Sequence, residues 1–263
     1  MYIRKIYRLP DRNEIEIGFA GRYGKKGEKR AKRKKLTPEQ MRRQNQINKT
    51  NKLRREMIAN FCEGDHFCTL KYHAGTRKPL KEIQKDLTNF KNCMRRAYRK
   101  LNAEFKWILR IEIGAQGGIH IHMLINRVKG ADSDSIIQEK WKHGRVNFQN
   151  CYEAGGFKEL ANYMVKVEDE SYEQLNLFSK KEQKVLTSIS TSKNLVRPEP
   201  EVKTYMKYTV EKLVKEGPKA ADGYYIDKDS VVTGFNEYTG LSYIHYTEIK
   251  TGGRNDVHKR LRI

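Results

Sequence analysis

Hydrophobic and polar positions follow a regular order of predicted strands and helices between residues 67 and 170. The segment FCTLKYH (67–73) has the composition of a strand. The two apolar runs at 105–113 and 119–126 flank the glycine-rich linker GAQGG and predict a β-hairpin. Between these regions, over residues 79–102, apolar side chains recur at steps of three and four and predict an amphipathic helix; they are Leu80, Ile83, Leu87, Phe90, Met94, Tyr98 and Leu101.

The pattern then continues with a helix, a strand and a second helix. A short helix is predicted at 133–141, where Asp132 or Ser133 can act as the N-cap. RVNFQNCY alternates as a strand, and GFKELANYMVKVEDE is helical. The order predicts an α+β fold, an antiparallel βαββαβ sheet of the ferredoxin or RRM type with helices on one face. We assign this core to residues 65–172.

Two further segments flank this core. In residues 1–64, strand-like segments around PDRN predict a hairpin, and a basic arm follows it. A helix is expected after Thr37, because Pro38 suits the first helical position and Gln40 completes a capping box. Residues 173–263 predict a small α/β extension of unknown role, in which NEYTG marks a turn between strands.

The charge of the chain indicates a polyanionic partner. There are 54 lysines and arginines against 32 acidic residues, a formal net charge of +22, and nucleic acid is the first candidate. No apolar run approaches the roughly 20 residues of a membrane-spanning helix, so we expect no membrane partner. The N-terminus lacks the apolar region of a signal peptide, and we expect the protein in the cytoplasm of a bacterial host cell.

Many basic residues are concentrated in the arm and the helix after it. Closely spaced like charges repel one another unless a polyanion relieves them, so we predict contacts with DNA phosphates. A solvated basic loop is the alternative. The predicted DNA-binding residues are Lys25, Lys26, Lys29, Arg30, Lys32, Arg33, Lys34, Lys35, Arg42 and Arg43, together with Arg110 in the hairpin.

The hairpin carries a candidate metal site. Residues two apart in a strand share a face, so His120 and His122 point to the same side. Pairing across GAQGG brings Glu112 and Arg110 near them on the neighbouring strand. Two imidazoles and a carboxylate can hold a divalent ion with open positions for phosphate oxygens. The alternative is a polar sheet face whose histidines form local hydrogen bonds.

A second candidate group lies on the last predicted helix of the core. Tyr163 and Lys166 are three residues apart and therefore share a helix face. A nearby cation favours the phenolate, the form in which tyrosine is a nucleophile, and Lys166 can serve in this way or bind the phosphate. Alternatively, Tyr163 is a packing aromatic. Tyr72, Trp107, Phe148 and Tyr152 are candidate platforms for base stacking, with the hydrophobic core as the alternative.

Together, these motifs resemble the HUH endonuclease superfamily, specifically the single-tyrosine rolling-circle replication initiators of phages and plasmids. The resemblance covers roughly residues 65–170. It matches the family's two histidines around an apolar residue, its acidic residue one hairpin upstream and its YxxK motif to His120, Ile121 and His122, to Glu112, and to Tyr163 and Lys166.

The resemblance implies a metal-dependent endonuclease and ligase, a nucleotidyltransferase that acts on single-stranded or hairpin origin DNA. Mn²⁺ or Mg²⁺ would be bound by Glu112, His120 and His122. Tyr163 would form a 5′-phosphotyrosine and release a 3′-OH that can prime synthesis. The chain shows no helicase segment, so a host helicase and a host polymerase are expected partners.

Two other readings remain open at this point. A non-catalytic, RRM-like nucleic-acid-binding protein explains the topology and the charge, but it leaves the histidine pair and the Tyr163/Lys166 pair as coincidences. A single-tyrosine transposase or a relaxase would use the same chemistry. Such transposases are usually shorter, and relaxases usually carry three histidines.

Overall fold

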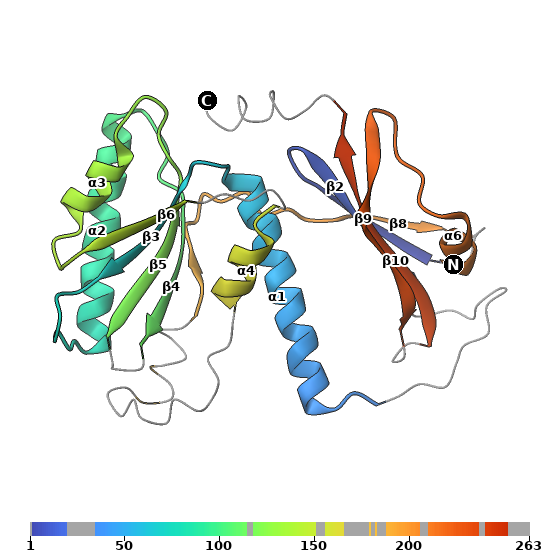
Figure 1. The fold of residues 1–263 in the computed structure, drawn as a ribbon, viewed down its shortest axis with the longest axis horizontal. Coiled ribbons are helices and arrows are strands. Elements are labelled where there is room, and N and C mark those ends of the chain that lie inside the picture. The colour runs from blue at the N-terminus through green and yellow to red at the C-terminus, as the bar shows by residue number, and fades with distance from the viewer. Residues whose placement is uncertain are drawn as a thin grey trace. The chain divides into compact units, whose positions relative to one another are not determined.

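The computed structural model of the protein describes residues 2–19, 35–114, 118–150, 156–165, 179, 182, 188–205, 210–236 and 240–251. The chain divides into two compact units, one formed by residues 1–48 with 197–261 and the other by residues 49–196. Figure 1 shows a β-sheet in each unit. All recorded strand pairs in both sheets are antiparallel.

The unit of residues 49–196 contains the predicted core sheet. Its strand order is β6-β3-β5-β4-β7. The strands are β3 (His66–Lys71), β4 (Trp107–Ile113), β5 (Ile119–Ile125), β6 (Val146–Asn150) and β7 (Ser190–Thr191). Three helices complete it, namely α2 (Leu80–Lys100), α3 (Ser133–Lys140) and α4 (Lys158–Val165). The predicted α+β class and βαββαβ order are confirmed, and β7 adds an edge strand beside β4.

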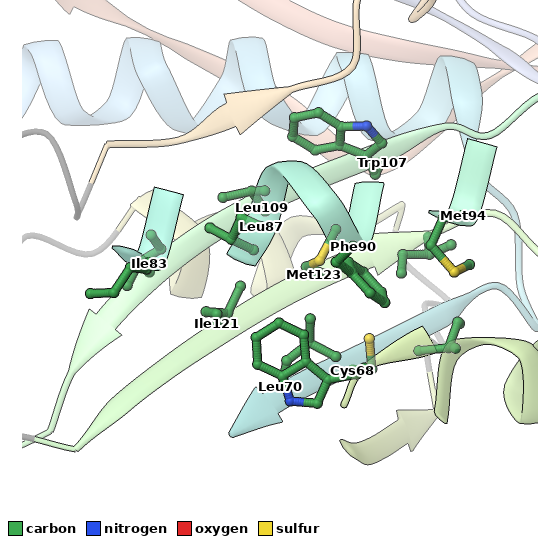
Figure 2. Close-up of a cluster of buried hydrophobic side chains, with 14 of the residues drawn as sticks. Cys68, Leu70, Ile83, Leu87, Phe90, Met94, Trp107, Leu109, Ile121 and Met123 are labelled. Carbon is green, nitrogen blue, oxygen red and sulfur yellow. The ribbon is translucent and has the colours of Figure 1, made fainter. Parts of the chain in front are cut away.

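One face of this sheet forms the hydrophobic core with α2 and α3. Alternate residues of β4 and β5, such as Leu109 and Ile121, point to this side and are buried. The apolar stripe of α2 packs against them, with Ile83, Phe90 and Met94 almost completely buried (Figure 2). The helical spacing of three and four therefore predicted the core-facing side of α2 correctly.

Helix α4 lies against the opposite face of the sheet. Arg110 and His122 point to this face, and both contact the main chain or side chain of Tyr163 in α4. Helix α4 buries Ala161, Met164 and Val165. The sequence predicted helices on one face only, and the structure adds α4 on the other. The reason is that the alternating polar residues of β4 and β5 need partners, which α4 supplies.

Local capping signals lie where the sequence predicted them. Thr37 and Gln40 form the two reciprocal hydrogen bonds of a capping box, 2.9 and 3.2 Å long, at the start of α1 (Pro38–Asn60). Asp132 caps α3 by accepting a hydrogen bond from the Ser135 main-chain N–H. The amide of Gly114 donates to the carbonyl of Gly118 (2.8 Å), which holds the ends of β4 and β5 together.

The second unit joins both ends of the chain in one sheet of strand order β8-β1-β2-β10-β9. Its elements are β1 (Tyr2–Arg8), β2 (Arg12–Phe19), β8 (Glu201–Tyr205), α6 (Val210–Glu216), β9 (Tyr224–Asn236) and β10 (Leu241–Lys250). Ile15 and Ile17 of β2 share a buried cluster with Ile244 of β10 and Val210 of α6. The N-terminal hairpin and the C-terminal extension, which the sequence suggested as separate parts, are thus strands of the same sheet. A lone hairpin is only marginally stable in water, which explains the need for this pairing.

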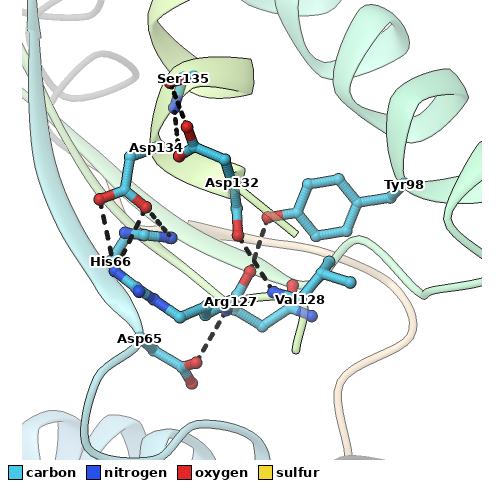
Figure 3. A network of polar contacts seen from close by, with 10 residues as sticks. Asp65, His66, Tyr98, Arg127, Val128, Asp132, Asp134 and Ser135 are labelled. Carbon is cyan, nitrogen blue, oxygen red and sulfur yellow. Dashed lines mark hydrogen bonds and ion pairs between the residues drawn. The ribbon is translucent and has the colours of Figure 1, made fainter. Parts of the chain in front are cut away.

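A polar network fixes the end of β5 that lies away from the hairpin (Figure 3). Asp65 accepts hydrogen bonds from the main-chain N–H groups of Cys62 and Arg127, both 2.8 Å long. The Arg127 side chain pairs with Asp134, which also lies 3.3 Å from His66 Nε2. Burial lowers the pKa of His66 despite the nearby Asp134 carboxylate. The network therefore ties β3, the segment after β5 and α3 together.

Candidate functional site

Strand register brings the predicted residues to one polar face of the sheet. In the β4–β5 pair, Glu112 is directly opposite His120 and Arg110 is opposite His122. In the β3–β5 pair, Thr69 is opposite His122. Residues directly opposite in antiparallel strands project on the same side, so these side chains form two neighbouring rows. The hairpin prediction thus placed Glu112 and both histidines on the correct face.

Three of the groups on this face are in direct contact. His122 Nε2 lies 2.9 Å from Glu112 Oε2. The Tyr163 hydroxyl lies 3.1 Å from the same carboxylate oxygen, to which it donates, and 3.0 Å from His122 Nε2. His122 is almost fully buried, whereas Tyr163 is 42% exposed. A phenol that is open to solvent therefore lies between a carboxylate and an imidazole.

The neighbours of His122 hold its ring in place. Thr69 Oγ1 lies 3.0 Å from His122 Nδ1, and this hydrogen bond is buried. Phe67 stacks on the His122 ring at a centroid distance of 6.1 Å and meets the Tyr163 ring edge-on at 6.2 Å. Threonine and phenylalanine in a strand carry no catalytic signal. Only the pairing of β3 with β5 reveals these two positioning residues, which the sequence analysis did not identify.

The environment keeps the tyrosine protonated and the imidazoles neutral. Burial raises the pKa of Tyr163 to about 12, with a further contribution from the adjacent Glu112 carboxylate. Burial lowers the pKa of His122, although Glu112 acts in the opposite direction. Burial and the charge of Lys71 lower the pKa of His120. A neutral imidazole has a free lone pair, which is the form that binds a metal ion.

His120 lies apart from the other three groups. Its ring centroid is 6.4 Å from that of His122. The ring is turned towards the end of the hairpin, where a Cβ built on Gly118 would lie 3.8 Å from His120 Nε2. Within the described residues, no three histidine, cysteine or acidic side chains converge closely enough to hold a metal ion. The predicted trio therefore shares one face, but only Glu112 and His122 touch.

The donor chemistry of this face nevertheless fits a divalent cation. A carboxylate oxygen and a neutral imidazole nitrogen are ligands that Mn²⁺ accepts, and Mg²⁺ prefers oxygen. The Thr69 hydroxyl on Nδ1 is the kind of outer contact that orients a metal-binding histidine and leaves its Nε2 to face the ion. Glu112 and His122 are thus the two donors already in position.

Arg110 has an unexpected partner. The sequence analysis grouped it with the DNA-binding residues, but its side chain is 7% exposed. It donates hydrogen bonds from one terminal nitrogen to the carbonyls of Tyr163 (3.2 Å) and Met164 (3.1 Å). Positive charge near the last carbonyls of a helix is favourable. Arg110 therefore holds the part of α4 that carries Tyr163 against the sheet.

The other predicted residues differ in how far the structure describes them. Lys35, Arg42 and Arg43 are exposed, the latter two on α1. Lys166 directly follows the last described residue of α4 and lies outside the described residues. The same is true of Lys25, Lys26, Lys29, Arg30, Lys32, Arg33 and Lys34.

The predicted stacking residues lie mainly in the core. Trp107 is 5% exposed, and Tyr72 and Phe148 are partly buried against the same cluster. Tyr152 is outside the described part of the chain. Among the helices that the structure describes, none is long and apolar enough to cross a membrane.

Comparison with known proteins gives one match. Neither the curated proteins nor the solved structures include a match to this chain. The family model of the replication-associated proteins of the ORF2 type matches residues 65–168. This segment extends from the start of β3 past Tyr163 and holds every residue of the polar face. The match supports a replication initiator family for the part of the chain that carries the candidate site.

Proposed function

We propose that the protein initiates rolling-circle replication by nicking and rejoining single-stranded DNA through a covalent bond to Tyr163. One observation carries this proposal: the Tyr163 hydroxyl lies 3.0 to 3.1 Å from His122 and Glu112, within the segment that matches the replication-associated family. A tyrosine that only packs in a core would be buried, whereas this hydroxyl is reachable from solvent.

Glu112 and His122 would hold the Mn²⁺ or Mg²⁺ ion, with His120 as the third ligand from the same face. When bound, the cation supplies a Lewis acid that polarises the scissile phosphate. Thr69 fixes the tautomer of His122 through Nδ1. Lys166 is the proposed positive group that favours the phenolate form of Tyr163.

The Tyr163 hydroxyl would act as the nucleophile. Glu112 Oε2 accepts its hydrogen bond and is therefore in reach of its proton. The phenolic oxygen bonds to phosphorus while the bond from phosphorus to the 3′ oxygen breaks, and that oxygen takes up a proton. The products are a 5′-phosphotyrosine and a 3′-OH. The reverse attack by a 3′-OH rejoins the strand without ATP, because one phosphodiester bond replaces another.

DNA binding would rest on electrostatics. Lys35, Arg42 and Arg43 are exposed and belong to the basic segment that also holds the lysines and arginines of positions 25–34. Such a segment contacts backbone phosphates with strong salt dependence and little sequence preference. The origin would be a single strand or a hairpin, and a host helicase and polymerase would extend the released 3′-OH.

The decisive test is covalent trapping. The purified protein is incubated with end-labelled single-stranded DNA and Mn²⁺ and resolved on a denaturing gel, beside Tyr163→Phe. The wild type should retain the label and Tyr163→Phe should lose it at unchanged DNA affinity. Tyr225→Phe is a matched control, because Tyr225 is also about half exposed but lies on β9. A persistent adduct in Tyr163→Phe would refute the assignment. Absence of any adduct, including with DNA from the protein's own replicon, would favour a non-catalytic binding protein.

A further inference from the structure

A second candidate ligand site lies on the other side of the core sheet. A groove with a volume of about 790 Å³ runs between the C-terminal half of α2, the start of β4 and the residues after β7. This volume is within the range of small-ligand sites. Its lining includes Arg95, Arg99, Phe105, Trp107 and Lys193.

The rim of this groove is strongly basic. Arg95 and Arg99 are one helical turn apart on α2, and both are exposed, as is Lys193. Neither arginine has an acidic partner in the part of the chain that the structure describes. The only acidic lining residue, Glu104, is 71% exposed and lies 4.0 Å from Lys106. The groove therefore has an excess of positive charge.

A fourth cation adds to this charge. Lys91 Nζ lies over the Trp107 ring, 4.7 Å from its centroid. Burial lowers the pKa of Lys91, and the neighbouring charge of Arg95 lowers it further. Like charges held this close repel one another, and an anion in the groove would relieve the repulsion.

The floor of the groove contains a hydrogen-bond donor without an acceptor. Trp107 is 5% exposed, and its Nε1 is buried with no partner among the described residues. Figure 2 shows its ring at the rim of the buried cluster. By contrast, the other tryptophan, Trp141, donates from Nε1 to the carbonyl of Lys71 (3.1 Å). A buried N–H without a partner costs about 1–3 kcal/mol, so a ligand oxygen that reaches it gains this contact.

We propose that this groove binds a phosphodiester segment of single-stranded DNA, with phosphate oxygens on Arg95, Arg99 and Lys193 and in reach of the Trp107 N–H. The choice of DNA as the source of the phosphate rests on the proposed function. Trp107 points to the α2 face, whereas Tyr163 contacts the opposite face. The groove would therefore hold a part of the strand away from the cleavage site.

The two indole N–H groups provide a direct test by ¹⁵N NMR of the full chain. Trp141→Phe assigns the two signals. Addition of oligothymidylate should shift the Trp107 signal to saturation and leave the Trp141 signal nearly unchanged. Inorganic pyrophosphate is the second arm. A Trp107 signal that moves with pyrophosphate but not with oligothymidylate would overturn the DNA assignment, and a signal that moves with neither would overturn the site.

Charge variants on α2 separate this groove from general attraction. Arg95→Gln/Arg99→Gln should abolish the Trp107 shift and lower the salt dependence of DNA binding by about 1.4 in the log–log slope, for two contacts on a single strand. Lys81→Gln/Lys85→Gln removes the same charge from the exposed N-terminal end of α2, outside the groove. This control should keep the Trp107 shift. Equal effects of the two double variants would refute a specific site.

The test is independent of catalysis. Tyr163→Phe should lose the covalent adduct and keep the Trp107 shift. If the wild type forms no adduct but the Trp107 signal still responds to oligothymidylate, the proposed function fails and the groove remains. If the adduct forms but the Trp107 signal does not respond, the groove fails and the proposed function remains.

Discussion

The two faces of the core sheet use the same strands for different purposes. On the α2 face, Leu109 and Ile121 are buried in a continuous hydrophobic cluster. On the α4 face, the alternate residues Glu112 and His122 contact each other and a solvent-open tyrosine. The period of two in a strand separates these sets completely. One face therefore provides stability, and its rigidity allows the other to carry polar groups at fixed positions.

His122→Ala should produce the largest effect. If Glu112 and His122 hold the cation, removing His122 should slow adduct formation on the order of 10³-fold, because Lewis-acid stabilisation is worth several kcal/mol. The measurement is the single-turnover rate with Mn²⁺. Circular dichroism should show an unchanged fold, and a rate within about twofold of the wild type would exclude His122 from the reaction.

Ile121→Ala tests the neighbouring residue that points to the other face. Ile121 is completely buried, and this substitution should lower the free energy of unfolding by about 2–5 kcal/mol. Urea denaturation gives the value. At low temperature, where the variant is folded, adduct formation should stay close to that of the wild type. A large loss of activity in a fully folded Ile121→Ala protein would contradict the separation of the two faces.

Arg110 distinguishes between DNA binding and positioning. Arg110→Met should slow adduct formation by about tenfold or more, since hydrogen bonds to a charged group contribute about 1.5–3 kcal/mol. Arg110→Lys should restore part of the rate. DNA affinity and its salt dependence should not change, because the guanidinium bonds to the carbonyls of α4. A reduced salt dependence in Arg110→Met would instead return Arg110 to the phosphate contacts.

Asp86 on α2 should show a smaller, pH-dependent effect. Burial acts to raise the pKa of this carboxyl, but hydrogen bonds from Lys78 (2.7 Å) and Tyr72 (3.0 Å) outweigh it and lower the pKa. A lowered folded-state pKa means that ionised Asp86 stabilises the protein above the unfolded pKa and that this stability is lost as the pH falls through the folded pKa.

The wild type should therefore lose about 1 kcal/mol more stability than Asp86→Asn between pH 5.5 and pH 3. Chemical denaturation at several pH values measures this difference. Parallel pH profiles of the two proteins would show that the Asp86 contacts contribute nothing.

Much of the core sheet was predictable because its signals are local. The apolar spacing in α2, the alternation in β4 and β5, and the capping box at Thr37 and Gln40 all depend on residues a few positions apart. These signals fixed the element order and the shared face of Glu112 with the histidines. They could not show that Arg110 would bond to the main chain of α4, because a strand pattern gives the side of the sheet and not the partner.

The sequence by itself determined the α+β order, the positive charge and the candidate residues, since periodicity and composition are properties of neighbouring positions. The tertiary structure decided which of these residues touch. It joined the N-terminal hairpin to β10, more than 200 residues away, and turned the His120 ring away from the pair formed by Glu112 and His122. Long-range strand pairing and side-chain rotamers depend on the packing of distant segments, which no local pattern encodes.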